Sequence, residues 1–133
     1  GANDVANSFS TAVASGTITH STAIKIALFA EFLGALILGS SVTDTVKKKV
    51  MDVTLFEHDP YVLMLGMGCT SFGSGLWVLL ATKFQMPVSS THATIGGIAG
   101  VAIAAFGLRG VVWNGIGMIV ASWFISPVCA GIV

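Results

Sequence analysis

The sequence predicts an all-α, polytopic helical membrane protein, because of its composition and two long uncharged segments. Of the 133 residues, 54% are apolar and only 9% are charged, against roughly a quarter charged in an ordinary soluble domain. With a mean hydropathy of +0.89, the chain has too little polar surface to coat a soluble globule of its size. It is therefore expected to form a single membrane domain over residues 1–133.

Five apolar segments are expected to be helical, at about residues 1–19, 23–43, 61–82, 87–106 and 111–133. Residues 61–82 and 111–133 carry no charge over 22 and 23 positions. At 1.5 Å per residue, each is long enough to cross a hydrocarbon layer of ~30 Å. The segment 23–43 is similar, but holds Lys25 near one end and Glu31 in its middle.

Most of the few charged residues gather in a polar loop that is expected at residues 44–60. It contains Lys47, Lys48 and Lys49, which favour a cytoplasmic loop by the positive-inside rule. Six basic and six acidic residues cancel over the whole chain, so there is no basic groove and no nucleic-acid partner is expected. The chain begins at Gly1 without Met and ends in an apolar run, which we interpret as a fragment.

The first polar cluster stands at the start of the chain, in Gly1-Ala2-Asn3-Asp4-Val5-Ala6-Asn7-Ser8. On a helix Asn3 and Asn7 share a face beside Asp4, and Thr11 follows on the same side. A buried carboxylate is costly unless it is neutralised, and no Lys or Arg lies within a turn. A hard monovalent cation or a proton is the natural counter-charge. The alternative is a solvated helix cap at an exposed chain end.

The second polar cluster is Met86-Pro87-Val88-Ser89-Ser90-Thr91-His92-Ala93-Thr94. Pro87 at a first helical position, followed by hydroxyls, predicts a helix that is broken or re-entrant near Pro87. A helix N-terminus offers unpaired N–H groups to an oxyanion such as phosphate or sulfate. The expected donors are the N–H groups of Val88, Ser89 and Ser90 and the hydroxyls of Ser89, Ser90 and Thr91. The alternative is that these hydroxyls only satisfy the backbone of a broken helix.

Two further titratable side chains lie within the apolar segments. Glu31 is an intramembrane acid, and such acids are usually ion or proton sites. Pairing with Lys25 has poor helical spacing. His92 is a weaker candidate for a ligand or proton carrier, because a single apolar-segment histidine is more often a hydrogen-bonded interior residue.

Repulsion within the expected site predicts coupling between two ions. An anion site beside Asp4 or Glu31 would repel its ligand, since unit charges 5 Å apart cost roughly 3 kcal/mol at an effective dielectric of 20. A co-bound cation removes that penalty. The residues therefore indicate a cation-coupled anion carrier, in which Na⁺ or H⁺ must load for the anion to bind.

These residues resemble the inorganic phosphate transporter (PiT) family of sodium- or proton-coupled phosphate symporters. The motifs GANDVANSFSTAVASGTIT at 1–19 and PVSSTH at 87–92 carry the likeness. It extends through FAEFLGALILGSSVTDTVKKKVMDV at 29–53 and SWFISPVCAGIV at 122–133. The resemblance implies one half of an inverted-repeat transporter, with a second inverted repeat elsewhere in the full-length chain.

The resemblance also implies roles for single residues. Phosphate would be bound by Ser89, Ser90, Thr91 and Asp4. The cation would be bound by Asn3, Asp4, Asn7 and Thr91, and if it is Na⁺ it would lie at Asn3, Asp4 and Asn7. Coupling would involve Glu31 and His92. Neither a cofactor nor enzymatic activity is implied. The protein would be an integral membrane protein of the plasma membrane, and a homodimer stays open.

Two other functions are considered from the residues. A membrane-embedded hydrolase could use Ser89 or Ser90 with His92, but residues so close on one turn cannot easily place nucleophile and base, and no G-x-S-x-G elbow is present. A structural or channel-like helical bundle would instead give uncoupled, non-saturating flux.

Overall fold

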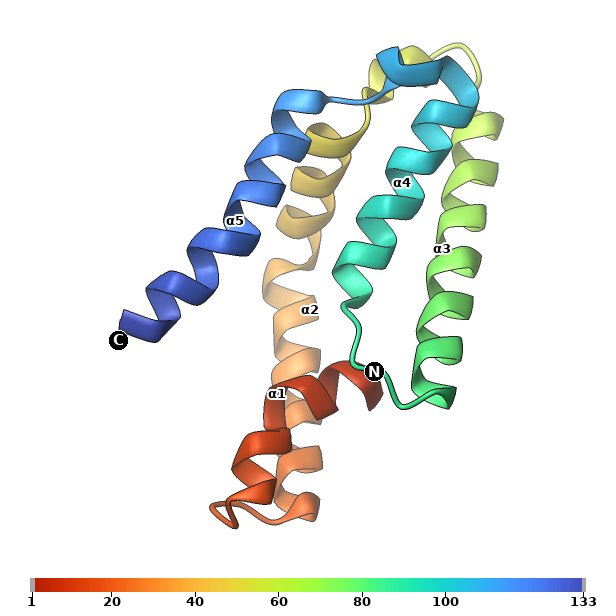
Figure 1. The fold of residues 1–133 in the computed structure, drawn as a ribbon. Coiled ribbons are helices and arrows are strands. Elements are labelled where there is room, and N and C mark those ends of the chain that lie inside the picture. Colours follow the sequence, from red (N-terminus) through yellow and green to blue (C-terminus); the bar gives the residue numbers. More distant parts are fainter. Residues whose placement is uncertain (1, 133) are drawn as a thin grey trace.

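The computed structural model describes residues 2–132, apart from the side chains of residues 2, 42 and 45–47. Its elements are α1 (Ala2–Ala14), α2 (His20–Val50), η1 (Val53–Phe56), α3 (Pro60–Lys83), α4 (Ser90–Phe106), η2 (Gly107–Gly110) and α5 (Trp113–Ile132) (Figure 1). The described residues form helices and no strand, which confirms the predicted all-α class. Gly1 and Val133, which the predicted segments include, lie outside the described residues.

Within the described residues 2–132, four helices are long and apolar enough to cross a membrane. The candidate spans are His20–Ser41, Pro60–Lys83, Ser90–Gly110 and Trp113–Ile132. Large apolar side chains stay exposed along them, as at Leu28 and Phe29, which are each 70% exposed. In a soluble protein such surfaces would drive association, whereas in a bilayer they face lipid or other membrane helices.

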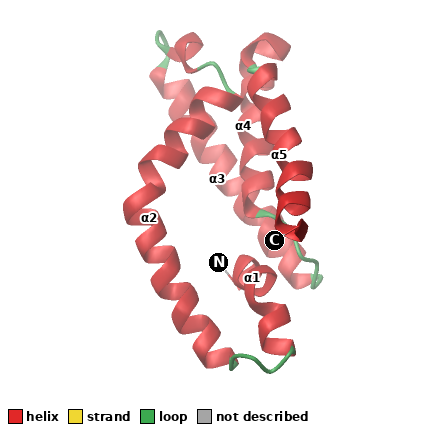
Figure 2. Ribbon diagram, turned by 90° about the vertical axis from the view of Figure 1, so that its left-hand side faces the viewer, coloured by secondary structure: helices red, strands yellow, loops and turns green. Residues whose placement is uncertain are grey.

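The helices α3 and α4 run antiparallel and side by side (Figure 1). Small residues allow this close approach, because a Cβ on Gly66 would collide with Val101, and one on Gly97 would lie 2.9 Å from Thr70 Cγ2. α2 meets the other spans near its C-terminal end and stands apart from α3 over its N-terminal half, where it contacts α1 (Figure 2).

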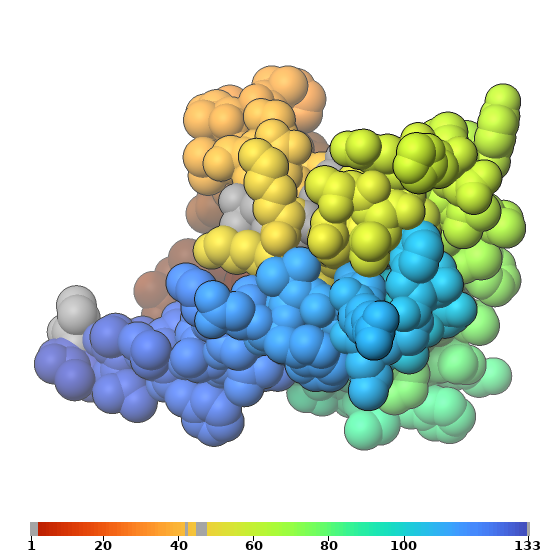
Figure 3. Space-filling model, turned by 90° about the horizontal axis from the view of Figure 1, so that it is seen from above, coloured from red at the N-terminus to blue at the C-terminus, as the bar shows by residue number. Residues whose placement is uncertain are grey.

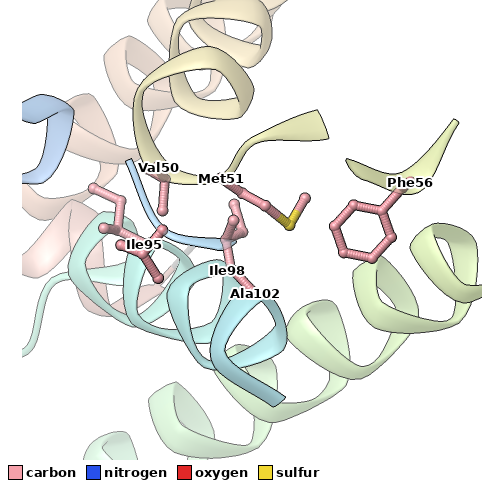
Figure 4. Packing of buried hydrophobic residues seen from close by; sticks show 7 residues of the cluster. Val50, Met51, Phe56, Ile95, Ile98 and Ala102 are labelled. Atoms are coloured by element: carbon pink, nitrogen blue, oxygen red, sulfur yellow. The ribbon is translucent and has the colours of Figure 1, made fainter. Parts of the chain in front are cut away.

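The buried core lies at one end of the bundle (Figure 4). The short helices η1 and η2 lie at the same end, side by side at the surface in the view from above (Figure 3). The members of the core are all apolar and come from α2, η1, α4 and two links between elements: Val50, Met51, Phe56, Ile95, Ile98, Ala102 and Val111. Phe56 also packs edge to face against Phe106, with ring centroids 4.7 Å apart. This end of the bundle is therefore the part of the chain held by its own packing.

A backbone clamp at the same end fixes α2 to α5. Met51 and Val111 form an isolated antiparallel bridge. Val112 N–H donates to the Val50 carbonyl and Asp52 N–H donates to the Gly110 carbonyl, both at 3.1 Å. One turn further on, the Lys49 carbonyl comes so close to Gly115 that a Cβ there would collide with it.

The predicted loop at 44–60 is wrong in its first half. α2 continues to Val50, so that Lys48 and Lys49 are helical and only residues 51–59 connect it to α3. No Gly or Pro interrupts residues 41–58, and lysines in a last helical turn interact favourably with the helix dipole. The side chain of Lys47 lies outside the described residues.

The first predicted segment, 1–19, is also too long. α1 ends at Ala14, and Gly16 follows with a φ of 75°. That left-handed conformation is accessible to glycine at little steric cost and ends the helix.

We expect Gly115→Ala to destabilise the clamp. The added methyl meets a backbone carbonyl that cannot rotate away, and such overpacking typically costs about 1–3 kcal/mol. Gly117→Ala is the matched control, because nothing lies within 4 Å of its Cβ position. The measurement is thermal unfolding of the two purified variants in detergent. Equal melting temperatures for both would contradict the packing described here.

Candidate functional site

The candidate site is built around the link between α3 and α4, residues 84–89. α3 ends in a Schellman motif, in which Met86 N–H donates to the Ala81 carbonyl and Gln85 N–H to the Thr82 carbonyl. Gln85 occupies the left-handed position with a φ of 57°. Pro87 follows and cannot continue a helix. The predicted break near Pro87 is therefore the link between the two antiparallel helices α3 and α4.

α4 begins three residues later than predicted. Pro87 was expected at the first helical position, but that position belongs to Ser90. Ser89 is the N-cap, with extended backbone and a side-chain oxygen that accepts from His92 N–H at 3.3 Å. The reason is that serine is among the best N-cap residues, so the cap and not the proline sets the start of the helix.

Asn3 fastens α1 to this link. Its Nδ2 donates to Thr82 Oγ1 and to the Met86 carbonyl, both at 3.2 Å. Its Oδ1 accepts from Val88 N–H at 3.2 Å and from Asn7 Nδ2 at 3.3 Å. An asparagine amide has two donors and two acceptor positions, so all four are used. Asn3 is only 8% exposed, and its amide holds the α3–α4 link in place.

Asp4 and Ser90 bring the two sequence motifs into direct contact. Ser90 Oγ donates to Asp4 Oδ2 at 2.5 Å, across 86 residues of sequence. Asp4 is half-buried in the first turn of α1 and meets the first residue of α4. Two helix N-termini therefore face one carboxylate, and both favour its negative charge.

Two oxygen atoms at this place are not bonded to other described residues. Asn7 Nδ2 donates to the Val88 carbonyl at 3.0 Å and to Asn3, which leaves Asn7 Oδ1 free. The second carboxylate oxygen of Asp4 is likewise without a described partner. Amide and carboxylate oxygens are the ligands that hard cations prefer. In the described part of the chain no three His, Cys, Asp or Glu side chains group together, which excludes a site of that type there.

The first turn of α4 offers backbone donors. The N–H groups of Ser89, Ser90 and Thr91 have no acceptor in the described part of the chain. The prediction that Val88 supplies such a donor is wrong, because its N–H is bonded to Asn3. Its place is taken by Thr91, which the sequence identified only through its hydroxyl.

A cleft of about 670 Å³ opens beside these donors, between α4, α5 and the end of α2. Ser89, Thr91 and His92 line it from α4, and Ser122 and Ser126 from α5. No local pattern singles out the two α5 serines, because they stand in an apolar segment without a motif. Lys49 also lines the cleft, and was missed because it was assigned to a loop.

His92 does not occupy the interior, hydrogen-bonded position that is commonest for such residues. Its side chain is exposed, and its ring packs edge to face against Trp123 with centroids 4.0 Å apart. This contact joins α4 to α5 at the wall of the cleft.

Glu31 stands apart from the two motifs in the described structure. Its side chain is exposed on α2, and it has no hydrogen bond or ion pair with a described residue. An unpaired acid facing lipid is costly, so in a membrane it must face water or another polar partner.

Comparison with known proteins identifies the family of the chain. All of residues 1–133 match the phosphate transporter family. The chain belongs to this family. The resemblance stated from its motifs is thereby confirmed, and the apolar spans are those of an integral membrane protein.

Relatives of this phosphate transporter family member occur in distant organisms. It is 51% identical to a Haemophilus influenzae protein over 99% of this chain and 31% of that protein. It is 43% identical to the phosphate-repressible phosphate permease pho-4 of Neurospora crassa, over 98% and 23%. It is 42% identical to sodium-dependent phosphate transporter 1 of Mus musculus, over 99% and 19%. The chain thus spans less than a third of the length of these relatives.

A solved structure is also similar. The structure described as the sodium-dependent phosphate transporter superposes with a TM-score of 0.89 at 42% sequence identity. The match covers 98% of this chain and 32% of that one. The arrangement of α1 to α5 is therefore the arrangement found in part of a larger transporter of the same family.

We expect Asn3→Ala to destabilise the protein more than Asn7→Ala. Removing the buried amide leaves Val88 N–H and the Met86 carbonyl without partners, at about 1–3 kcal/mol. Asn7 is exposed, so water replaces its bonds to the link. The two melting temperatures in detergent provide the test. A loss from Asn7→Ala as large as that from Asn3→Ala would contradict the fastening role of Asn3.

Proposed function

We propose that this chain belongs to one of two inverted halves of a transporter that moves inorganic phosphate across a membrane together with a cation. The observation that carries the proposal is the contact between Asp4 and Ser90, which joins a carboxylate to a helix N-terminus rich in free donors. Family membership supports phosphate as the substrate. The printed names of relatives, such as sodium-dependent phosphate transporter 1, support coupling to sodium.

The cation would be bound by oxygen atoms of the first motif. Asp4 supplies a carboxylate and Asn7 a free amide oxygen, with Thr91 as a further hydroxyl ligand. Asn3 was also predicted as a cation ligand, but its oxygen already accepts from Val88 N–H and Asn7 Nδ2, so it would instead position the motif. An amide oxygen is a normal ligand for Na⁺ but is not protonated at physiological pH, which favours Na⁺ over H⁺. No resident cofactor is needed in this mechanism.

Phosphate would be bound by the first turn of α4. The N–H groups of Ser89, Ser90 and Thr91 and the hydroxyls of Ser89 and Thr91 are donors of the kind that oxyanions require. Ser90 contributes its N–H, because its hydroxyl is given to Asp4. Asp4 was also predicted as a phosphate ligand, and as a carboxylate it would act on phosphate through the cation that it holds. Phosphate arriving next to the Asp4 carboxylate is repelled by roughly 3 kcal/mol at 5 Å. A cation already bound to Asp4 cancels this repulsion, which makes transport cation-dependent.

The proposed transporter is larger than this chain. A second inverted repeat would close the site from the opposite side, and alternating access would follow from movement of one half against the other. Glu31, exposed on α2, would face a polar path between the halves, and His92 would influence entry from the wall of the cleft. The plasma membrane is the proposed location, and a homodimer is compatible with the exposed apolar surfaces.

The hydrolase alternative is disfavoured by the hydroxyl contacts. Ser89 Oγ accepts from His92 N–H, and Ser90 Oγ donates to Asp4. The His92 ring packs on Trp123 instead of meeting either hydroxyl. The base of that hydrolase would be His92, and this arrangement does not bring the His92 ring within hydrogen-bond reach of either serine hydroxyl.

We expect Asp4→Asn to abolish Na⁺-dependent phosphate uptake, because the neutral amide no longer attracts the cation. Uptake of radiolabelled phosphate is measured in proteoliposomes holding the complete protein, with and without a Na⁺ gradient. Asp59→Asn is the matched control, since Asp59 lies outside the spans and its side chain caps no helix. It should retain uptake within about twofold of the parent.

Three results would contradict the proposal. Absence of saturable phosphate uptake by the parent protein would exclude phosphate as the substrate. Uptake that depends on a pH gradient and not on Na⁺ would replace the proposed cation by H⁺. Unchanged Na⁺ dependence in Asp4→Asn would remove the carboxylate from the cation site.

A further inference from the structure

The cleft beside the α4 N-terminus contains a cationic side chain that neither motif includes. Among the described residues that line this cleft, Lys49 is the only lysine or arginine. Ser89 and Thr91, two of the proposed phosphate ligands, line the same cleft. The three residues come from the end of α2 and the start of α4, which are about 40 positions apart in sequence.

The backbone of Lys49 is held rigidly in this position. Its carbonyl lies directly against Gly115 of α5, and the next residue, Val50, is fully buried in the core. The Val50 carbonyl also accepts from Val112 N–H. Lys49 is itself half-buried, and the apolar residues Ile95 and Ile119 line the same cleft. The charged group of a lysine, on its aliphatic stem, can reach into a polar space while its base stays fixed.

We propose that Lys49 attracts and orients the phosphate anion on its way to the first turn of α4. The inference rests on the proposed function and adds a specificity-determining residue to it. Asp4 makes the immediate surroundings of that turn negative until a cation binds. A lysine ammonium in the adjoining cleft supplies the opposite field and raises the local concentration of anions.

Comparison with Lys48 shows that lining the cleft is a property of the Lys49 position and not of the two adjacent lysines together. Lys48 is exposed and does not line the cleft. It lines a separate polar hollow with Asp44 and Ser40, which Lys49 also borders. The two neighbouring lysines therefore have the same charge, lie on the same helix and share this hollow, but of the two Lys49 alone also lines the cleft, which makes Lys48 a matched control.

The test is the concentration dependence of phosphate uptake by the complete protein in proteoliposomes at saturating Na⁺. We expect Lys49→Gln to raise the KM for phosphate about five- to tenfold at low ionic strength, with maximal velocity within about twofold of the parent. Added salt should shrink this difference, because it screens the charge. Lys49→Arg should keep the parent KM, and Lys48→Gln should change it by less than about twofold.

Each other outcome has a definite meaning. Saturable uptake with the same KM in Lys49→Gln as in the parent overturns this inference and leaves the proposed function intact. Absence of saturable uptake in the parent overturns both. An equal rise in KM for Lys48→Gln also overturns the inference, because it shows a general surface charge effect.

A lipid phosphate group offers the same chemistry as inorganic phosphate, and the vesicle composition separates the two. The measurement is repeated in liposomes with and without phosphatidylglycerol. A KM effect of Lys49→Gln that is equal in both supports direct attraction of inorganic phosphate. An effect that vanishes without the anionic lipid overturns the inference, because Lys49 would then act by binding lipid.

Discussion

The buried amide of Asn3 is the interaction on which the candidate site depends. With both donors and both acceptor positions engaged, it fixes the C-terminal end of α3, the link after it and the first turns of α1 relative to one another. Because the amide is almost fully buried, each lost bond would leave an unsatisfied polar group. The contact between Asp4 and Ser90 follows from this fastening, since Asp4 is the next residue of α1 and Ser90 begins α4 just beyond the link.

The negative charge of Asp4 is stabilised by the helix N-termini around it and not by a paired cationic side chain among the described residues. The Asp4 carboxylate faces the N-termini of α1 and α4, which partly stabilise it without an ion pair. The same helix N-terminus carries the donors that an oxyanion needs, so carboxylate and anion compete for one favourable field. A cation bound to Asp4 cancels the repulsion between the carboxylate and the anion, and Lys49 attracts the anion from the adjoining cleft. The coupling of two ions is thus a consequence of placing one acid at an anion-binding turn.

Much of this arrangement could be predicted from the sequence, and the rest shows what sequence patterns leave out. The apolar segments gave the number and order of the helices, because length and hydropathy determine which segments can span a membrane. The chemistry of both motifs indicated a carboxylate beside an anion-binding turn. The start of α4 was misplaced because proline and serine are both good starting residues, and only the cap bond to His92 selects Ser89.

Long-range contacts were the main part that could not be predicted. Val88 looked like a free donor, since no local pattern shows that its N–H is paired with a residue 85 positions earlier. Lys49 looked like a loop residue, because three adjacent lysines resemble a polar connection. Its place at the cleft depends on the clamp between α2 and α5 and on the absence of a side chain at Gly115. Such properties are set by tertiary packing and leave little local trace.

The central claim is that phosphate binds at the first turn of α4 next to a cation held by Asp4. The most direct measurement is a cryo-electron microscopy structure of the complete protein in Na⁺ and phosphate. The account predicts phosphate density within hydrogen-bond distance, about 3 Å, of the N–H groups of Ser90 and Thr91, and a separate cation density at the Asp4 carboxylate. Phosphate density at another place, with the first turn of α4 unoccupied, would contradict it.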